Sequence, residues 1–330
     1  MRITVLGGGS WGTALAHLFA RKGHELILHV RDSALAGLIN SKHENPRYLP
    51  GLALCPSLRA SVDEEEALRG TDILVIAVPC QFMREALREI APRLPAHAVP
   101  VCASKGVELA TIKRMSQVVA DTLPDQAERY AILSGPSFAR EVVEEKPTAV
   151  VLGCADARIG EKLREALSCS VFRVYSCTDV VGVELGGAVK NIMAIAAGFC
   201  DGLRLGDNAR AALITRGLAE MSRLGAALGA RPATFMGLSG MGDLVLTCTG
   251  DLSRNRQVGM RLAEGQSMER IAAGMHMVAE GVKTTEAVRE LGQRLNVELP
   301  ITCAVARLIK AEATPRELVH ELMTRALREE

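Results

Sequence analysis

Residues 3–12 read Ile-Thr-Val-Leu-Gly-Gly-Gly-Ser-Trp-Gly, and this stretch decides the fold. A short apolar, β-branched run is followed by the G-x-G-x-x-G spacing at Gly7, Gly9 and Gly12, and a helical pattern begins at residue 11. Such glycines permit a tight turn and the close approach of a pyrophosphate to the backbone N–H groups of a helix start. The stretch therefore predicts a dinucleotide site, with a glycine turn that serves only strand-to-helix packing as the alternative.

The first half of the chain alternates short strand-like runs with amphipathic helical stretches, the pattern of a parallel sheet covered by helices. The candidate strands are residues 3–6, 25–30, 72–78, 98–103, 130–133, 148–152 and 171–175. The candidate helices are residues 11–21, 64–68, 82–90, 112–120 and 158–166. We therefore predict an α/β protein that opens with a doubly wound, Rossmann-type parallel sheet.

The strand pattern stops near residue 178, and the rest of the chain is typical of helices separated by glycines. The expected helices are residues 180–199, 208–228, 254–263, 283–295 and 315–327. The last begins with Thr314-Pro315-Arg316-Glu317, a capping box with proline at the first helical position. We predict a dinucleotide-binding domain over residues 1–178 and a mainly α-helical domain that binds substrate and carries catalysis over residues 179–330.

The composition is that of an ordinary globular protein. The 330 residues include 39 Lys plus Arg and 38 Asp plus Glu, which leaves a formal net charge of +1 and none of the basic excess of nucleic-acid binders. The nine cysteines show no C-x-x-C pair, so we expect small buried residues in a reducing cytoplasm and no metal site. Residues 3–20 lack charge but contain Gly7, Gly8 and Gly9, so we expect neither a signal peptide nor membrane insertion.

The end of the second predicted strand bears on the choice of cofactor. An NAD-selective site usually offers a carboxylate there to the ribose hydroxyls, whereas this chain has Arg31 followed by Asp32. Because arginine pairs with a 2′-phosphate, the sequence favours NADPH over NADH. Asp32 contacting the ribose, or Arg31 standing solvated at the strand end, are the alternatives.

Lys190 is the one charged side chain within residues 185–200. Burying it would favour its neutral form and make it a usable proton donor and acceptor, and its charged form could stabilise an alkoxide. Gly186 and Gly187 lower helix propensity, so we expect another backbone or a ligand to come close to them. A lysine whose head reaches solvent from a packing helix is the alternative.

Ser253-Arg254-Asn255-Arg256 opens another predicted helix, with Ser253 as its N-cap. Cations beside the positive end of a helix are unfavourable unless an anion is bound there. Arg254 and the helix N–H groups would suit a phosphate, and a solvated basic turn is the alternative.

Taken together, these segments resemble the NAD(P)-dependent glycerol-3-phosphate dehydrogenases of the bacterial cytoplasmic type over nearly the whole chain. Besides the glycine loop, the motifs that carry the resemblance are residues 133–139, Lys190-Asn191 and residues 215–218, 237–244, 246–249, 253–256 and 278–282. The resemblance implies reversible reduction of dihydroxyacetone phosphate to sn-glycerol 3-phosphate, supplying glycerophospholipid synthesis, with NADPH or NADH as cofactor.

The resemblance also implies the site residues. It makes Lys190 the catalytic proton donor and acceptor. It assigns the dinucleotide to Gly7, Gly9, Ser10, Trp11, Gly12, Arg31, Lys105, Ala139, Arg254, Val278 and Glu280. It assigns the phosphorylated substrate to Lys105, Gly135, Ser137, Lys190, Asn191, Asp243, Thr247, Ser253, Arg254 and Asn255.

Two other functions stay open. Related hydroxyacid dehydrogenases share this architecture but carry an asparagine four residues after the catalytic lysine, where this chain has Ala194. A 3-hydroxyacid or ketopantoate-type reductase is therefore the alternative enzyme. A non-catalytic module that senses NADPH would need the glycine loop but not Lys190 or Arg254. We expect a small phosphorylated substrate and no nucleic-acid partner, and we retain a homodimer as an expectation.

Overall fold

A computed structural model describes residues 1–275 and 279–325, and the chain divides into two compact units. Unit 1 comprises Met1–Lys105 and Lys113–Glu184, and unit 2 comprises Gly106–Ile112 and Leu185–Glu330. Each unit is described by itself below.

Unit 1 is built on a sheet of eight strands in the order β10-β9-β8-β5-β4-β1-β2-β3. Its strands are β1 (Arg2–Leu6), β2 (Glu25–His29), β3 (Arg59–Ser61), β4 (Ile73–Ile76), β5 (Val99–Cys102), β8 (Ala131–Ser134), β9 (Thr148–Cys154) and β10 (Phe172–Cys177). From β1 the chain builds outward through β2 and β3, then returns to β4 on the other side of β1. The residues after β1 therefore lie at the point where the strand order reverses, where doubly wound sheets bind ligands.

The sheet is mainly parallel, and β9 is the exception. It pairs antiparallel with β8, with Ile132 opposite Gly153, whereas β10 runs parallel to β9. The helix between β8 and β9, α6 (Ala139–Val143), has five residues and spans about 7.5 Å. The predicted parallel sheet is therefore confirmed as mainly parallel, with the β8–β9 pair antiparallel.

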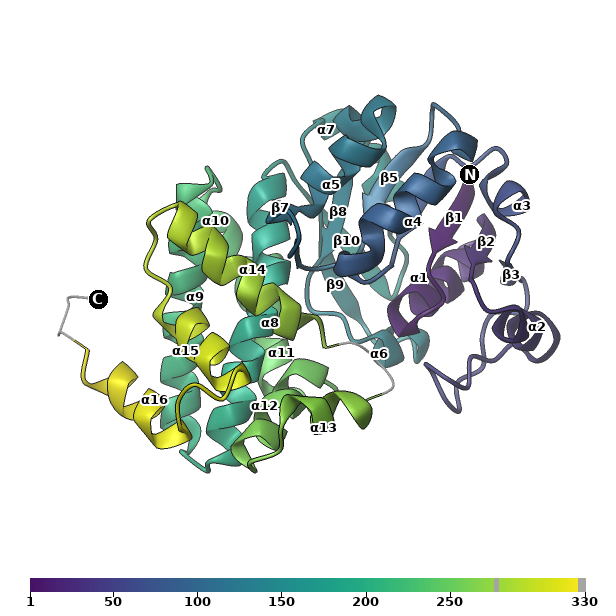
Figure 1. Ribbon diagram of the computed structural model, residues 1–330. Helices are drawn as coiled ribbons and strands as arrows, with labels where there is room; N and C mark the ends of the chain where they lie inside the picture. Colours follow the sequence, from purple (N-terminus) through teal and green to yellow (C-terminus); the bar gives the residue numbers. More distant parts are fainter. Residues whose placement is uncertain (276–278, 326–330) are drawn as a thin grey trace. The chain divides into compact units, whose positions relative to one another are not determined.

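Helices cover both faces of the sheet (Figure 1). One apolar cluster joins the sheet to α1 (Ser10–Arg21), α2 (Ser33–Lys42), α6 and α7 (Ala157–Leu167). The other joins it to α3 (Glu64–Leu68), α4 (Met83–Ile90) and α5 (Met115–Thr122). Strand β4 shows why: Ile73 and Val75 point into the first cluster, and Leu74 and Ile76 point into the second. A strand buried on both faces needs such a continuous apolar run.

Some boundaries differ from those predicted. Helix α5 begins at Met115 rather than at residue 112, because Ile112 has a φ of 58° and cannot start a right-handed helix. Residues 113–114 form the short strand β7 (Lys113–Arg114), and β6 (Val107–Glu108) precedes it in unit 2. Strand β3 and helix α2 were missed, since three residues are too few for a visible alternation and α2 contains glycine and asparagine.

Apart from the short strand β6, unit 2 is helical within the part of the chain that the structure describes. Its elements are α8 (Val180–Gly202, which enters the unit at Leu185), α9 (Asp207–Ala227), α10 (Pro232–Phe235), a π-helical turn at Leu238–Gly242, α11 (Asp243–Thr249), α12 (Arg254–Ala263), α13 (Met268–Ala273), α14 (Glu280–Arg294), α15 (Pro300–Ile309) and α16 (Pro315–Met323). Helix α15 lies beside α9 and α14 (Figure 1). The capping box predicted at α16 is confirmed: Glu317 N donates to Thr314 Oγ1, and Thr314 N donates to Glu317 Oε2 at 2.7 Å.

Helix α8 is apolar around nearly its whole circumference. Among the described helices it is the one long and apolar enough to cross a membrane, but 83% of its most apolar stretch is buried inside the protein. Burial on all sides is the pattern of a core helix.

The first turns of α8 belong to unit 1, where Val183 packs in the same cluster as Ile132. Glu184 accepts hydrogen bonds there from Ser116 N at 2.6 Å and Tyr130 Oη at 2.9 Å. These contacts join the first turns of α8 to unit 1, which ends at Glu184.

The cysteines are free thiols. Cys80, Cys102, Cys154 and Cys248 are buried, as expected, whereas Cys303 is exposed, so the expectation of buried cysteines was wrong there. Within residues 1–275 and 279–325, no group of three or more His, Cys, Asp or Glu side chains is placed to hold a metal ion.

Candidate functional site

The glycine loop after β1 is fixed by backbone contacts. Gly7 has a φ of 114°, and a Cβ there would lie 2.7 Å from the carbonyl oxygen of Ala77. A Cβ on Gly12 would lie 1.9 Å from the carbonyl oxygen of Gly7. Real Cβ atoms do not approach backbone that closely, so these two positions need glycine for the turn and for packing of α1 against the sheet.

Gly9 is different, because a Cβ there would meet no atom within 4 Å. It is the N-cap of α1, which has no side-chain cap and no acidic residue in its first turn. The indole Nε1 of Trp11 is buried and has no hydrogen-bond partner among the described residues. Open space beside Gly9, with N–H groups left for an anion, fits the diphosphate of a dinucleotide.

Asn45 holds this loop from outside the motif. Its side-chain amide donates to the carbonyl oxygen of Gly8 at 3.1 Å and to Thr13 Oγ1 at 2.8 Å, and the residue is fully buried. Tyr48 N donates to Asn45 Oδ1 at 3.2 Å, which fixes the amide orientation. Sequence reasoning missed Asn45, because nothing in its local sequence shows that it contacts a loop more than thirty residues away.

The two candidates at the end of β2 have different environments. Asp32 is the N-cap of α2: one carboxylate oxygen accepts from Ala34 N at 2.9 Å and Leu35 N at 3.2 Å. Its other oxygen lies 3.7 Å from Arg47 Nη1. Arg31 is exposed beside it. Asp32 therefore caps the start of α2, and the contact of Arg31 with a 2′-phosphate remains a prediction.

The carboxyl ends of β5 and β8 bring together three of the predicted substrate residues. The two strands pair in parallel, so Lys105 after β5 and Gly135 after β8 meet at one edge of the sheet. Lys105 Nζ donates to the carbonyl oxygen of Gly135 at 3.1 Å, and Ser137 Oγ donates to the same oxygen at 2.9 Å. Ala139, predicted to contact the dinucleotide, is the first residue of α6 and packs against the core. A lysine directly after a buried strand was the signal that could have identified Lys105 from the residues alone.

In unit 2 the centre is Lys190 on α8. Its ammonium group donates to Asp243 Oδ1 at 2.5 Å and to Thr247 Oγ1 at 2.8 Å. The Lys190 and Asp243 side chains are 9% and 1% exposed, so the ion pair is almost completely removed from water. Thr247 Oγ1 also donates to the carbonyl oxygen of Asp243 at 2.6 Å, one helical turn earlier on α11. Burial alone would favour neutral lysine, as the sequence suggested, but the Asp243 carboxylate stabilises the ammonium form.

The π-helical turn that precedes Asp243 packs directly on α8. A Cβ on Gly186 would lie 2.4 Å from the carbonyl oxygen of Ser239, so the close backbone approach predicted for this glycine is confirmed. A Cβ on Gly240 would lie 2.1 Å from the carbonyl oxygen of Phe235. π-helical turns are rare and are frequent at functional sites, and this one sets the start of the helix that carries Asp243 and Thr247.

Asn191, next to Lys190 on α8, is linked by hydrogen bonds to the starts of two further helices, α12 and α14. Asn255 Nδ2, on α12, donates to Asn191 Oδ1 at 3.0 Å, and Gly281 N, at the start of α14, donates to Asn255 Oδ1 at 3.0 Å. A Cβ on Gly281 would lie 2.7 Å from Asn255 Oδ1. The two asparagines are buried and hydrogen-bonded to each other, and the substrate assigned to them remains a prediction.

The start of α12 carries the remaining candidates. Ser253 is confirmed as the N-cap, with its Oγ accepting from Arg256 N at 3.3 Å. Burial lowers the pKa of the Arg254 guanidinium, and the negative charge of Glu280 offsets part of this lowering. Val278, also predicted to contact the dinucleotide, lies outside the described residues.

The comparisons with known proteins now decide the family. The model of the N-terminal part of NAD-dependent glycerol-3-phosphate dehydrogenase matches residues 2–159, and the model of its C-terminal part matches residues 179–320. The chain belongs to this family. Its predicted resemblance to the glycerol-3-phosphate dehydrogenases is therefore confirmed.

Individual glycerol-3-phosphate dehydrogenases agree over the full length. The chain is 64% identical to a glycerol-3-phosphate dehydrogenase (NAD(P)+) of Nitratidesulfovibrio vulgaris over 330 residues, which is 100% of both chains. A crystal structure of glycerol-3-phosphate dehydrogenase from Coxiella burnetii is 40% identical, with a TM-score of 0.93 over 98% of this chain and 99% of that one. The predicted fold, enzyme class and nicotinamide cofactor, NADPH or NADH, are confirmed at this level.

The alternative enzyme class shares the architecture only. A ketopantoate reductase from Ralstonia eutropha is 17% identical, with a TM-score of 0.59 over 97% of this chain and 100% of that one. A likeness at this identity shows the fold and leaves the substrate open. The match to the glycerol-3-phosphate dehydrogenase family models therefore distinguishes this chain from the related reductases.

Proposed function

We propose that this chain catalyses the reversible reduction of dihydroxyacetone phosphate to sn-glycerol 3-phosphate with NADPH or NADH, the reaction of its family. The observation that carries the proposal is the buried contact of Lys190 with Asp243 and Thr247. A cation held in a nearly dry environment stabilises a developing alkoxide far better than one in water. In the cell we expect the product to supply glycerophospholipid synthesis.

Lys190 is the proposed proton donor and acceptor. The bound nicotinamide supplies the hydride, and the chain supplies the proton and the stabilising charge. The Lys190 ammonium would donate a hydrogen bond to the carbonyl oxygen of the substrate and give it a proton as the alkoxide forms. Asp243 keeps this ammonium charged, and Thr247 and Asn191 would line the same pocket.

The substrate phosphate is assigned to the start of α12. Arg254, Asn255, Ser253 and the N–H groups of this helix supply positive charge and donors, and an anion would offset the cost of desolvating Arg254. We also assign Lys105, Gly135 and Ser137 to the substrate, supported by their contact at the carboxyl edge of the sheet.

The dinucleotide is assigned to the glycine loop and its surroundings. Open space at Gly9, the uncapped start of α1 and the unsatisfied Trp11 Nε1 support this assignment. The further assigned residues are Gly7, Ser10, Gly12, Arg31, Lys105, Ala139, Arg254, Val278 and Glu280. Because Asp32 caps α2, exposed Arg31 supports a preference for NADPH over NADH.

One set of absorbance measurements tests substrate and cofactor together. We expect oxidation of reduced nicotinamide with dihydroxyacetone phosphate, and little with unphosphorylated dihydroxyacetone or with ketopantoate. Arg31→Ala should raise the KM for NADPH about tenfold or more and leave the KM for NADH nearly unchanged, since it removes a charge-assisted contact to the 2′-phosphate. Arg69→Ala is the matched control, because Arg69 is an exposed arginine of unit 1 before β4, at the opposite end of the sheet strands.

The other results would redirect the assignment. Turnover of ketopantoate or of a 3-oxo acid in place of the phosphorylated ketone would favour the related reductases. Cofactor binding without turnover of any of these substrates would favour a sensing module. Equal effects of Arg31→Ala on both cofactors would remove Arg31 from 2′-phosphate recognition.

We place the protein in the cytoplasm and outside the membrane, which the free cysteines and the buried surface of α8 support. A homodimer without nucleic-acid partners completes the proposal. Sedimentation of the purified protein and fractionation of cells that express it test these two points.

A further inference from the structure

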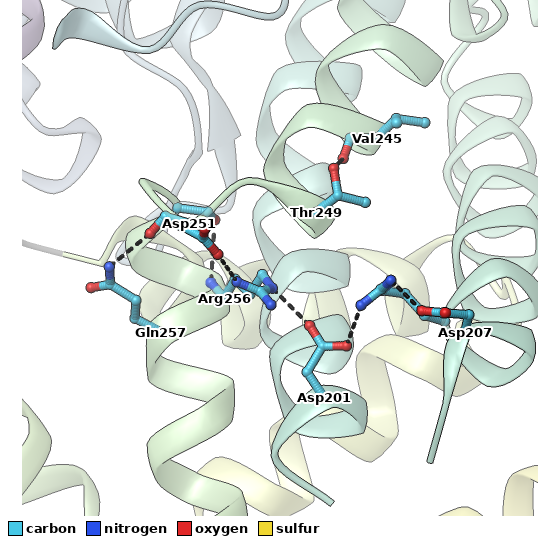
Figure 2. Close-up of polar contacts among 9 residues, drawn as sticks. Asp201, Asp207, Val245, Thr249, Asp251, Arg256 and Gln257 are labelled. Atoms are coloured by element: carbon cyan, nitrogen blue, oxygen red, sulfur yellow. Dashed lines mark hydrogen bonds and ion pairs between the residues drawn. The ribbon is translucent and has the colours of Figure 1, made fainter. Parts of the chain in front are cut away.

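Arg256 lies two residues after Arg254, and its positive charge is paired with carboxylates of unit 2. Its Nε donates to Asp201 Oδ2 at 2.7 Å, and its Nη1 lies 2.9 Å from Asp251 Oδ1 (Figure 2). The Arg256 and Asp201 side chains are 13% and 12% exposed, so this pair is largely shielded from water. An anion was expected near Arg254 and Arg256 at this helix start. For Arg256, the anions are the carboxylates of Asp201 and Asp251.

Asp201 lies near the C-terminal end of α8, and two helices contact its carboxylate. Arg256 reaches one oxygen from α12, and Arg210 Nη1 reaches the other from α9 at 2.8 Å. Arg210 also contacts the exposed Asp207. The two arginines thus share one carboxylate, but only Arg256 belongs to the helix whose start carries Arg254 and Asn255.

Helices α8 and α12 touch through their backbones between these polar contacts. A Cβ on Gly198 would lie 1.9 Å from the carbonyl oxygen of Arg256, and a Cβ on Gly259 would lie 2.0 Å from the carbonyl oxygen of Ile195. A glycine contact permits close approach but has no side chains to interlock, so it does little to resist sliding or rotation. Other groups must fix the register of the two helices.

Two side-chain contacts are placed to do so. The Asn255–Asn191 hydrogen bond lies beside Lys190, and the Arg256–Asp201 pair lies ten residues further along α8, about 15 Å by helix geometry. Contacts at two separated points of α8 restrain both the position and the direction of the first turn of α12. Lys190 and Asn191 are on one helix of this pair, and Arg254 and Asn255 are on the other.

We propose that Arg256, held by Asp201, is a positioning residue that sets the start of α12 for binding the substrate phosphate. This inference rests on the proposed function, which places the phosphate at Arg254 and Asn255 and the reacting carbonyl at Lys190. The distance between the phosphate and the carbonyl of one small substrate is fixed by its bonds. An error of about 1 Å between the two groups of ligands is enough to lower kcat/KM on the order of 10²-fold.

The test compares two arginines that share Asp201. Arg256→Ala should raise the KM for dihydroxyacetone phosphate about tenfold or more and change kcat less. The Kd for NADPH should rise by less than this KM, because the diphosphate is assigned to the glycine loop of unit 1. Arg210→Ala removes the other contact of the same carboxylate and should leave that KM within about twofold. Arg256→Lys should recover part of the loss, because an ammonium can reach Asp201 but replaces only one donor of the guanidinium. Thermal unfolding of each variant checks that it is folded.

Three results would overturn the inference. Equal KM changes in Arg256→Ala and Arg210→Ala would show a general loss of stability in place of positioning. A fall in kcat alone would place the effect at Lys190. A wild-type KM in Arg256→Ala would show that the pair does not matter for the substrate.

Calorimetric titration with inorganic phosphate separates this inference from the proposed function. If the wild type does not turn over dihydroxyacetone phosphate, the proposed function fails, and the positioning role is then read from phosphate binding. Phosphate binding about tenfold weaker in Arg256→Ala than in Arg210→Ala would support it, and equal binding in the two variants would overturn it.

Discussion

The glycine loop of unit 1 and the lysine cluster of unit 2 are built in opposite ways. The loop is shaped by backbone: Gly7 and Gly12 are placed where a single Cβ would collide with main-chain atoms. The cluster is shaped by side chains: Lys190 meets Asp243 and Thr247, which lie more than fifty residues later in the chain. The loop should therefore be sensitive to the smallest added side chain, and the cluster to the loss of one functional group.

The largest expected effect is at the cluster. Lys190→Ala should lower kcat by on the order of 10² or more, because it removes both the proton donor and the charge that stabilises the alkoxide, while the Kd for NADPH stays nearly unchanged. Steady-state kinetics and cofactor titration measure the two effects. Lys162→Ala, at an exposed lysine of α7, is the control and should behave as the wild type.

A second variant separates chemistry from folding. Lys190→Ala leaves the buried Asp243 carboxylate without this cation, which costs about 3 to 5 kcal/mol in comparable pairs. Lys190→Arg keeps the positive charge, but a guanidinium does not release its proton. A folded Lys190→Arg protein with near wild-type kcat would remove proton transfer by Lys190 from the mechanism.

Two alanine substitutions in the loop should differ in kind. Gly12→Ala places a Cβ 1.9 Å from the carbonyl oxygen of Gly7, so the loop must shift, and we expect a loss of about 1 to 3 kcal/mol in unfolding free energy as well as weaker cofactor binding. Gly9→Ala has open space, so its stability should change little. Its Kd for the dinucleotide should nevertheless rise about tenfold, because the Cβ occupies the space assigned to the diphosphate.

Urea unfolding and cofactor titration of both variants measure this difference. Wild-type affinity in Gly9→Ala would contradict the assignment of the diphosphate to that space. Unchanged stability in Gly12→Ala would contradict the view that the loop is determined by its backbone contacts.

The same contrast explains what could be predicted from the sequence. Residues 3–12 predicted the strand, the turn and the helix correctly, because local backbone geometry determines all three. Ser253 as an N-cap and the capping box at Thr314 and Glu317 were also confirmed, since these contacts span only three residues. Local rules of this kind apply before the tertiary structure is known.

Contacts between distant parts of the chain were not visible in the same way. Lys190 stood out as a lone charge in an apolar stretch, but Asp243 was assigned to the same substrate site only through the family resemblance, and Asn45 was not found at all. Arg256 shows the limit most clearly: its position at a helix start suggested an anion, and the structure supplies Asp201 and Asp251. The reversal at β9 was also missed, because the apolar pattern of a strand does not show in which direction it runs beside its neighbour.

The smallest expected effect concerns His17, on the helix that follows the glycine loop, and tests whether this side chain also contributes to stability. His17 is buried on α1, and its Nδ1 accepts a hydrogen bond from Cys55 N at 3.0 Å, which requires the neutral ring. Burial lowers the pKa of His17 below its ordinary value of 6.5, and the positive charge of Arg21 lowers it further. The unfolded chain therefore binds a proton more readily than the folded one.

The contribution of neutral His17 to stability should be complete above pH 6.5 and should be lost as the pH falls below 6.5 through the lowered pKa of the folded state. His17→Asn keeps an acceptor near the position of Nδ1 and does not titrate, so its urea midpoint should fall less than that of the wild type between pH 8 and pH 5.5. His29, whose pKa is also lowered by burial, is present in both proteins and cancels in the comparison. Equal pH dependence in the two proteins would show that α1 is held without a contribution from His17, leaving backbone contacts and Asn45 as the determinants of the loop.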